Sequence, residues 1–117
     1  MKINQNNAGL TAEKLAASYL IDHGLKLLAQ NYHCRFGEID LIMQENNTLV
    51  FIEVRLRSTA LFGNAASSIT KQKQEKLIRT AEHYLQQHGD AACRFDAILL
   101  NKPDVEHLVW LRNAFDT

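Results

Sequence analysis

The fold is decided by two neighbouring stretches of sequence, GEIDLIM at residues 37–43 and LVFIEVRLR at residues 49–57. Both alternate apolar with polar side chains, and the second is rich in β-branched and aromatic residues, as is typical of β-strands. Asn46 and Asn47 stand between them and are a signal for a tight turn. The sequence therefore predicts a β-hairpin.

The register of this hairpin follows if Asn46 and Asn47 are the two central residues of its turn. Asp40 then lies directly across from Glu53, and successive side chains point to opposite faces of the hairpin. The polar face carries Glu38, Asp40, Glu53, Arg55 and Arg57. The apolar face carries Ile39, Leu41, Met43, Val50, Ile52, Val54 and Leu56.

The facing carboxylates of Asp40 and Glu53 need a compensating positive charge, because like charges opposite each other destabilise a sheet. Arg55 and Arg57 could supply it in a purely structural ladder of charges. A divalent cation is the other explanation, since magnesium is commonly held by one or two carboxylates together with waters and phosphate oxygens. Such an ion activates water for the hydrolysis of a phosphate ester. Both interpretations remain open on this pattern alone.

Helices and further strands extend the pattern in both directions from the hairpin. Apolar side chains that recur every three or four positions predict amphipathic helices, and Gly24 and Gly89 follow them as stop signals. The predicted elements are helices over 11–23 and 69–87, strands over 25–34 and 95–100, and either a strand or a helix over 105–115. The prediction is an α/β fold in the order α-β-β-β-α-β with a short C-terminal element, in which helices flank a mixed sheet.

The chain has 117 residues, 46% of them hydrophobic, and a formal net charge of zero. This length suits a single domain over residues 1–117, with a core over about 9–115. Neutrality excludes a wholly basic coat for nucleic acid. Residues 53–79 nevertheless hold six basic and two acidic residues. This segment is either a basic binding face or an ordinary solvated helix surface.

The cysteines and the N-terminus bear on where the protein works. Cys34 and Cys93 belong to no C-x-x-C pair, so no zinc site is indicated, and both are interpreted as buried thiols in a reducing compartment. Residues 1–10 lack the apolar core of a signal peptide, and no apolar run is long enough to cross a membrane. We expect a cytoplasmic protein without a membrane partner.

Polar residues of the predicted helices adjoin the polar face of the hairpin. The apolar stripe of residues 69–87, extended backwards, reaches Lys73 and Gln74, and an inward-facing lysine needs an anionic partner. A lysine that snorkels at a helix end is the alternative. Glu13 flanks the buried stripe of the first helix, although an acid near a helix N-terminus also suits the helix dipole. Asp96 is interpreted as a local ion pair or cap, and Trp110 as a core residue.

Several blocks of the sequence resemble the YraN family, a set of small bacterial proteins regarded as predicted endonucleases. The blocks are Ala12-Glu13, Gly37 to Ile42, Phe51 to Arg55, Lys73-Gln74 and Cys93 to Asp96, and the similarity covers about residues 9–115. That family is placed with the PD-(D/E)xK nucleases, which have a restriction-endonuclease-like core, and is similar to archaeal Holliday-junction resolvases. The resemblance implies the element order α-β-β-β-α-β, which the sequence pattern predicts independently.

The resemblance also implies roles for individual residues. Asp40 and Glu53 match the acids that hold Mg²⁺ or Mn²⁺ in the motif, and Glu13 matches an acid on the first helix of the resolvase-like branch. Arg55 stands where the motif usually has lysine, and arginine is a poor base whose planar fork suits phosphate. We hypothesise that Lys73 supplies the missing ammonium group.

The expected function is metal-dependent hydrolysis of DNA, in particular of branched or damaged DNA. The catalytic candidates are Glu13, Asp40, Glu53, Arg55 and Lys73, and the candidates for nucleic-acid binding are Arg57, Lys71, Gln74 and Lys76. Phosphate contacts of this kind give salt-sensitive binding with little sequence preference. The rival hypothesis is a catalytically inactive module on the same fold that binds nucleic acid or a protein partner. A homodimer would suit a junction that is cut at two symmetric positions.

Overall fold

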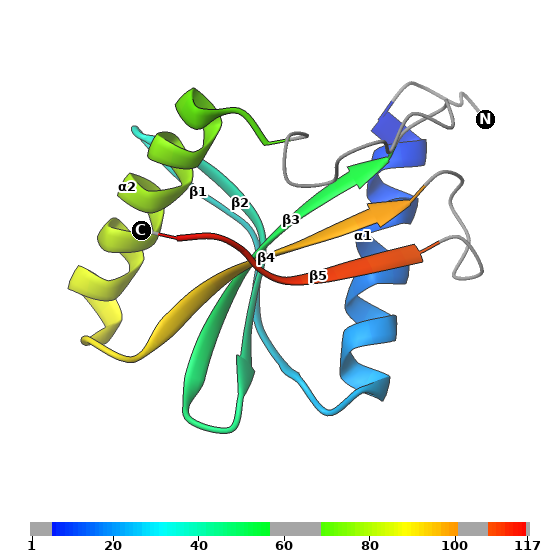
Figure 1. Cartoon of the computed structure of the whole chain (residues 1–117), viewed down its shortest axis with the longest axis horizontal. Helices are drawn as coiled ribbons and strands as arrows, with labels where there is room; N and C mark the ends of the chain where they lie inside the picture. Colours follow the sequence, from blue (N-terminus) through cyan, green and yellow to red (C-terminus); the bar gives the residue numbers. More distant parts are fainter. Residues whose placement is uncertain (1–5, 57–68, 101–107, 117) are drawn as a thin grey trace.

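The chain folds into one five-stranded sheet with a helix against each face (Figure 1). The computed structural model describes residues 6–56, 69–100 and 108–116. In chain order the elements are α1 (Asn6–Asp22), β1 (Lys26–Cys34), β2 (Gly37–Glu45), β3 (Thr48–Leu56), α2 (Lys71–His88), β4 (Cys93–Leu100) and β5 (Leu108–Phe115). This confirms the predicted α/β fold and order α-β-β-β-α-β, and the C-terminal element is a strand.

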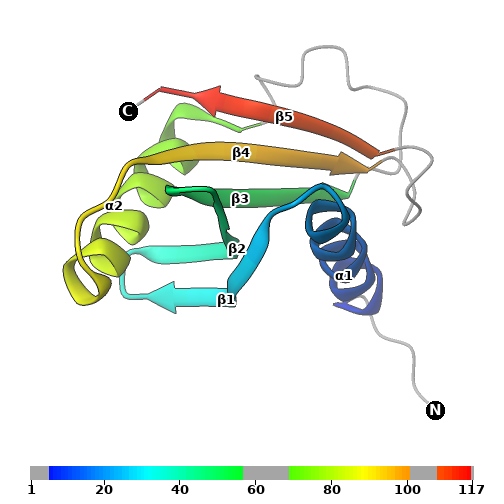
Figure 2. The ribbon, with the colours of Figure 1, turned by 90° about the horizontal axis from the view of Figure 1, so that it is seen from below.

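The strands follow one another across the sheet in the order β1-β2-β3-β4-β5. β3 and β4 are parallel and are joined through α2, whereas the other neighbouring pairs are antiparallel. The sheet is therefore mixed, as predicted. Figure 2 shows the strands lying one beside another from β1 to β5, with α1 and α2 at opposite ends of the strands. The two helices pack on opposite faces of the sheet.

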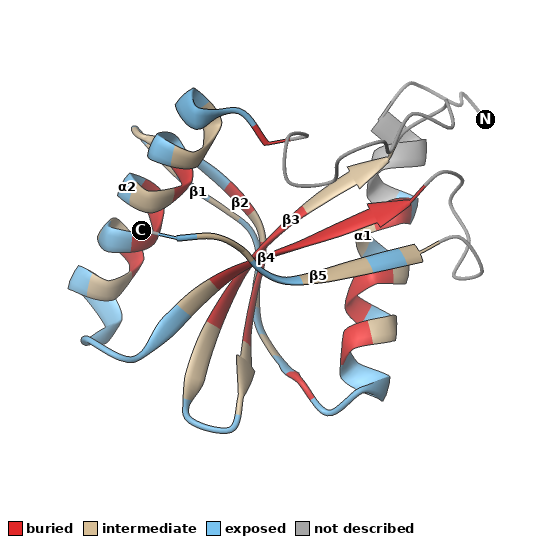
Figure 3. Ribbon diagram, viewed as in Figure 1, coloured by how far each residue is buried: buried red, intermediate tan, exposed pale blue. Residues whose placement is uncertain are grey.

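Two apolar clusters hold the layers together, one on each face of the sheet (Figure 3). The first joins α1 to the sheet and includes Ala16, Leu20, Leu41, Met43, Val50, Ile52 and Ile98. The second joins α2 to the sheet and includes Ile39, Ile42, Phe51, Leu77, Ala81, Tyr84 and Phe95. Since the central strands β3 and β4 are covered on both sides, most of their residues are buried.

The predicted hairpin register is confirmed where the strands pair, because Ile42 faces Phe51 and Glu45 faces Thr48. Asn46 has a φ of 55°, the left-handed conformation that asparagine tolerates in tight hairpin turns. The side chains of β3 therefore alternate between the two faces of the sheet as the sequence predicted, with Val50 and Ile52 on the α1 side.

The prediction was wrong for Ile39, which lies on the α2 side of the sheet and not with Leu41 on the α1 side. The cause is a break in the alternation of β1 and β2 at one level of the sheet. Asn31 has a φ of 50°, and the pairs on either side of it are Gln30 with Leu41 and Tyr32 with Ile39. The left-handed residue turns the following side chain of β1 to the other face, and β2 changes face at the same level, between Ile39 and Leu41.

The interpretation of both cysteines as buried thiols was also wrong. Cys34 is half-buried at the end of β1, and Cys93 is exposed at the start of β4. Both stand at strand ends, outside the two apolar clusters. Among the described helices, none combines the length and the apolar character needed to cross a bilayer.

Candidate functional site

β2 and β3 part from each other at the acidic pair. The last paired residues toward this end are Leu41 and Ile52, one position short of Asp40 and Glu53. Beyond them the backbone N–H of Val54 donates to Oδ2 of Asp40 at 2.8 Å. The carboxylate of Asp40 therefore takes the place of a main-chain acceptor and is fixed at the point where the strands separate.

Glu53 is the buried member of the pair. It is only 5% exposed, at the end of β3 that faces the first turn of α2. Its Oε2 atom lies 3.5 Å from Nη1 of Arg55 and 3.6 Å from Nζ of Lys73. Lys73 thus has the anionic partner that its inward position on the helix required, and two cations share one carboxylate oxygen.

The pKa of Glu53 is raised to about 7, first by burial and then by the negative charge of Asp40. Lys73 and Arg55 act in the opposite direction and favour the ionised form. A carboxyl pKa that stays raised beside two cations indicates that the repulsion and the desolvation outweigh the ion pairs. Without a further positive charge, burial and the charge of Asp40 thus favour the protonated form of Glu53.

Glu13 brings a third carboxylate to the site from α1. Its pKa is also raised to about 7, first by burial and then by the charge of Asp40. A hydrogen bond with the Asn31 side chain lowers that pKa in part, and the charge of Glu38 adds a small increase. Asp40 is thus the acid that interacts with both Glu13 and Glu53.

The chemistry of this donor set fits a hard divalent cation. Carboxylate oxygens are the ligands that Mg²⁺ prefers, and this ion is usually held by one or two carboxylates plus waters and phosphate oxygens. No three His, Cys, Asp or Glu side chains are grouped closely enough to cage an ion anywhere in the described part of the chain. Asp40 and Glu53 as a pair therefore suit a site completed by water and a ligand, and do not suit a closed structural site.

The remaining predicted residues differ in their surroundings. Lys71 and Lys76 are exposed on α2, free to contact a ligand from outside. Gln74 is half-buried, and its Nε2 donates to the carbonyl of Ile69 at 3.0 Å, which gives it a local structural contact. Arg57 lies outside the described residues.

Asn31 belongs to this site and was missed by the sequence reasoning. Its hydrogen bond with Glu13 places it beside the acids, and its left-handed backbone conformation turns it there from β1. The one signal in the sequence was an asparagine inside a predicted strand, where that residue is disfavoured. Such a residue more often marks a strand end, so the signal does not lead to a functional prediction.

The structure explains Asp96 and Trp110 without a role in this site. Asp96 is 1% exposed and accepts hydrogen bonds from Arg94, from Trp110 and from the backbone N–H of Asn113. Trp110 packs against the α1-side cluster. The predicted local ion pair of Asp96 is confirmed, whereas Trp110 is only partly buried and lies at the edge of the core.

Comparison with known proteins identifies relatives over nearly the whole chain. A family model described as "Uncharacterised protein family UPF0102" matches residues 12–100. The chain belongs to this family. The match to UPF0102 includes Glu13, Asp40, Glu53, Arg55 and Lys73, and it confirms the membership that the resemblance to the YraN family implied.

Individual UPF0102 proteins are similar throughout their length. The chain is 59% identical to one from Methylobacillus flagellatus over 107 residues, which are 92% of this chain and 95% of the relative. It is 57% identical to one from Nitrosomonas europaea over 111 residues, 94% of each chain. It is 53% identical to one from Psychromonas ingrahamii, again over 111 residues, 94% of this chain and 90% of the relative. The similarity thus extends over nearly the full length of this chain and of these relatives.

Proposed function

We propose that this protein is a metal-dependent nuclease with a restriction-endonuclease-like core, which hydrolyses phosphodiester bonds in branched or damaged DNA. The observation that carries the proposal is the pair Asp40 and Glu53 at the point where two strands part, with Lys73 and Arg55 on one oxygen of Glu53. Two acids that repel each other beside two cations are suited to a metal ion and a phosphate together.

In this proposal each residue has one task. Asp40 and Glu53 would hold Mg²⁺ or Mn²⁺, with Glu13 contributing directly or through water. The bound ion would supply a Lewis acid for the phosphate and a more acidic water. Arg55 and Lys73 would bind the phosphate oxygens and orient the attacking water, since both already reach the edge of the acidic site.

The N-terminus of α2 supports a phosphate at this place. Its first turn holds Lys71 and Lys73 and no acidic residue, although the helix dipole favours acids there and disfavours cations. Thr70 caps the helix by accepting from the N–H of Lys73 at 3.1 Å. Two lysines at a helix N-terminus attract an anion more strongly than either feature does alone.

The first experiment is calorimetric titration of the protein with Mn²⁺, beside the variant Asp40→Asn. The proposal expects binding to the wild type and none to the variant, because Asp40 is the acid shared by the whole site. Cleavage of branched and duplex DNA is then measured with Mn²⁺ and with EDTA. Absence of Mn²⁺ binding, both alone and with DNA present, would contradict the proposal.

The second candidate function is a binding module that has the same fold but lacks the chemistry. Arg55 in place of the usual lysine favours it, since arginine does not serve as a base near neutral pH. A binding module would bind DNA equally well with EDTA and after Asp40→Asn. A nuclease would lose its activity under both conditions.

A further inference from the structure

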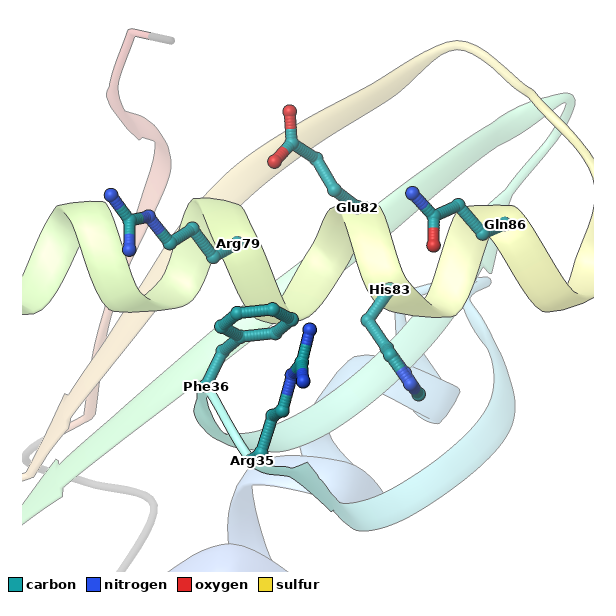
Figure 4. A pocket seen from close by; sticks show the side chains of 6 residues that line it. All are labelled: Arg35, Phe36, Arg79, Glu82, His83 and Gln86. Carbon is teal, nitrogen blue, oxygen red and sulfur yellow. The ribbon is translucent and has the colours of Figure 1, made fainter.

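A groove runs along α2 where the turn between β1 and β2 meets the helix (Figure 4). It consists of two adjoining cavities of about 350 and 320 Å³, and both are lined by Arg35, Phe36 and Arg79. His83 lines the first cavity and Lys76 the second. Each volume is at the lower end of the range for small-ligand pockets.

The turn that forms one wall of this groove is not built from turn-forming residues. Arg35 and Phe36 are its two central residues, between the paired Cys34 and Gly37. Neither of them has a positive φ, so the turn is not of the type that hairpins favour, in contrast to the turn at Asn46. Two large side chains thus occupy a tip where asparagine and glycine are the usual choice.

Gly37 holds this tip close to the helix. A Cβ atom at Gly37 would lie 3.2 Å from the hydroxyl oxygen of Thr80 and 3.6 Å from Cβ of Lys76. The absence of a side chain therefore lets the start of β2 pass against α2. This close approach places Phe36 beside the helix and sets the width of the groove (Figure 4).

The wall of the groove offers a flat aromatic surface. The rings of Phe36 and His83 meet edge to face, with 6.5 Å between their centroids. The guanidinium carbon of Arg35 lies 4.8 Å from the centroid of the Phe36 ring. Nδ1 of His83 is hydrogen-bonded to the hydroxyl of Tyr32, which fixes the imidazole and leaves Nε2 for a ligand. Aromatic rings and guanidinium planes are the surfaces on which unpaired bases stack.

The cations of the groove are not neutralised by neighbours. Within the described residues no ion pair involves Arg35, Lys76 or Arg79, whereas Arg94 and Arg112 both pair with Glu45. Two acids also line the cavities, Glu75 and Glu82. Three cations, Arg35, Lys76 and Arg79, thus line the groove against these two acids.

We propose that this groove binds an unpaired segment of single-stranded DNA, with a base stacked on Phe36 and the adjoining phosphates on Arg35 and Arg79. The inference rests on the proposed function, which takes DNA as the substrate. In a branched substrate, the groove would bind the single-stranded part while the acidic site acts on the phosphodiester bond. Lys76 connects the groove to the acidic site, because it follows Lys73 by one turn of α2. A phosphorylated or acidic peptide would use the cations but not the aromatic surface.

The test measures binding of a labelled oligo(dT) of about 20 nucleotides by fluorescence anisotropy, in EDTA and at low salt. Phe36→Ala should weaken binding about tenfold, and Phe36→Trp should retain it and show quenching of the new indole by the stacked base. The double variant Arg35→Ala with Arg79→Ala should weaken binding about tenfold and make it less dependent on salt. Lys26→Ala is the matched control, because it removes one exposed charge from the opposite end of β1.

Three outcomes would overturn the inference. In the first, Phe36→Ala binds oligo(dT) as the wild type does. In the second, Lys26→Ala weakens binding as much as the double variant, which would show general electrostatic attraction. In the third, poly-glutamate is bound with the same dependence on Arg35 and Arg79, and oligo(dT) binding is independent of Phe36. That last result would indicate a site for acidic proteins.

The design separates this inference from the proposed function, since no step of the binding test needs metal or cleavage. If oligo(dT) binding depends on Phe36 but the protein binds no Mn²⁺ and cleaves no DNA, the groove is a binding site for single-stranded DNA and the proposed nuclease activity is wrong. If cleavage depends on metal and is lost in Asp40→Asn, but Phe36→Ala binds oligo(dT) as the wild type does, the proposed nuclease activity is supported and the inference about the groove is wrong.

Discussion

At the scale of single residues, the acids of the site tie the stability of the metal-free protein to pH. Glu13 and Glu53 have pKa values of about 7 in the folded chain, against an ordinary value of 4.5. Between these values the folded state binds more protons than the unfolded state. The free energy of unfolding therefore falls as pH rises from about 4.5 to about 7, and it is level above that range.

This dependence predicts that the EDTA-treated protein is less stable at pH 8 than at pH 5, by about 2 kcal/mol once solvent screening of the partly exposed Glu13 is allowed for. Urea denaturation at the two pH values checks it. Asp40→Asn should reduce the difference and stabilise the protein at pH 8, because the charge that raises both pKa values is removed. An equal free energy of unfolding at both pH values in the wild type would contradict the assigned repulsion.

Lys73 is the residue on which the proposed chemistry most depends, since Arg55 cannot act as a base. Lys73→Ala is expected to lower kcat by about 100-fold or more, with a smaller change in KM. Lys73→Arg should keep the ion pair with Glu53 and restore substrate binding more than turnover. Lys71→Ala, two positions away and exposed, is the control and should alter only salt-sensitive binding. Unchanged turnover in Lys73→Ala would refute the assignment of the ammonium group to this residue.

At the scale of elements, one buried carboxylate joins β4 to β5. Asp96 takes hydrogen bonds from Trp110 at 3.0 Å and from the N–H of Asn113 at 2.8 Å, and it pairs with Arg94 at 3.0 Å. The pairing of the two strands shifts register between Phe95 and Ala97, so main-chain bonds are interrupted at this level. The Asp96 side chain supplies contacts that the ladder lacks there.

Asp96→Ala should therefore lower the free energy of unfolding by about 2–3 kcal/mol, because the Trp110 indole and the Asn113 N–H lose their acceptor while Arg94 keeps its ion pair with Glu45. If this variant does not fold, Trp110→Phe removes one of the hydrogen bonds and should cost about 1 kcal/mol. Both are measured by chemical denaturation. Stability equal to the wild type in Trp110→Phe, with the same slope against denaturant, would show that this bond contributes little.

At the scale of the whole molecule, the proposed cation links the two layers of the fold. Glu13 belongs to α1, while Asp40 and Glu53 belong to the central hairpin, so a bound ion would stabilise their arrangement. Mn²⁺ at about 100 times its dissociation constant is expected to add about 2.7 kcal/mol to the free energy of unfolding. Thermal denaturation with Mn²⁺ and with EDTA measures this. The same rise of Tm in Asp40→Asn would place the ion elsewhere.

The proposed role on branched DNA also makes a prediction about assembly. A junction presents two equivalent cutting positions, and we expect a symmetric homodimer for that substrate. Sedimentation velocity over a range of concentrations, with and without a four-way DNA junction, tests it. A protein that stays monomeric in both cases would contradict junction resolution, while cleavage of other DNA structures would remain the proposal.

Much of this molecule could be predicted from residues that are close in sequence. The hairpin register followed from the two asparagines and the alternation around them, and the helices followed from apolar spacing, because such patterns reflect local geometry and one buried face. The prediction that Lys73 faces an acid likewise followed from the helical period, because the apolar stripe of the helix extends backwards to this position. The two cysteines were misjudged because burial at a strand end depends on what covers it, which composition does not state.

Tertiary structure alone decided the rest. The alternation of β1 and β2 reverses at the level of Asn31, so that Ile39 lies on the α2 side and Asn31 meets Glu13. The separation of β2 from β3 at Asp40, and the groove between Phe36 and α2, arise from contacts between elements far apart in the chain. The sequence by itself determined the elements and the acids that they carry, since these depend on local periodicity. Which side chains meet depends on packing across the sheet, and only the folded chain contains that information.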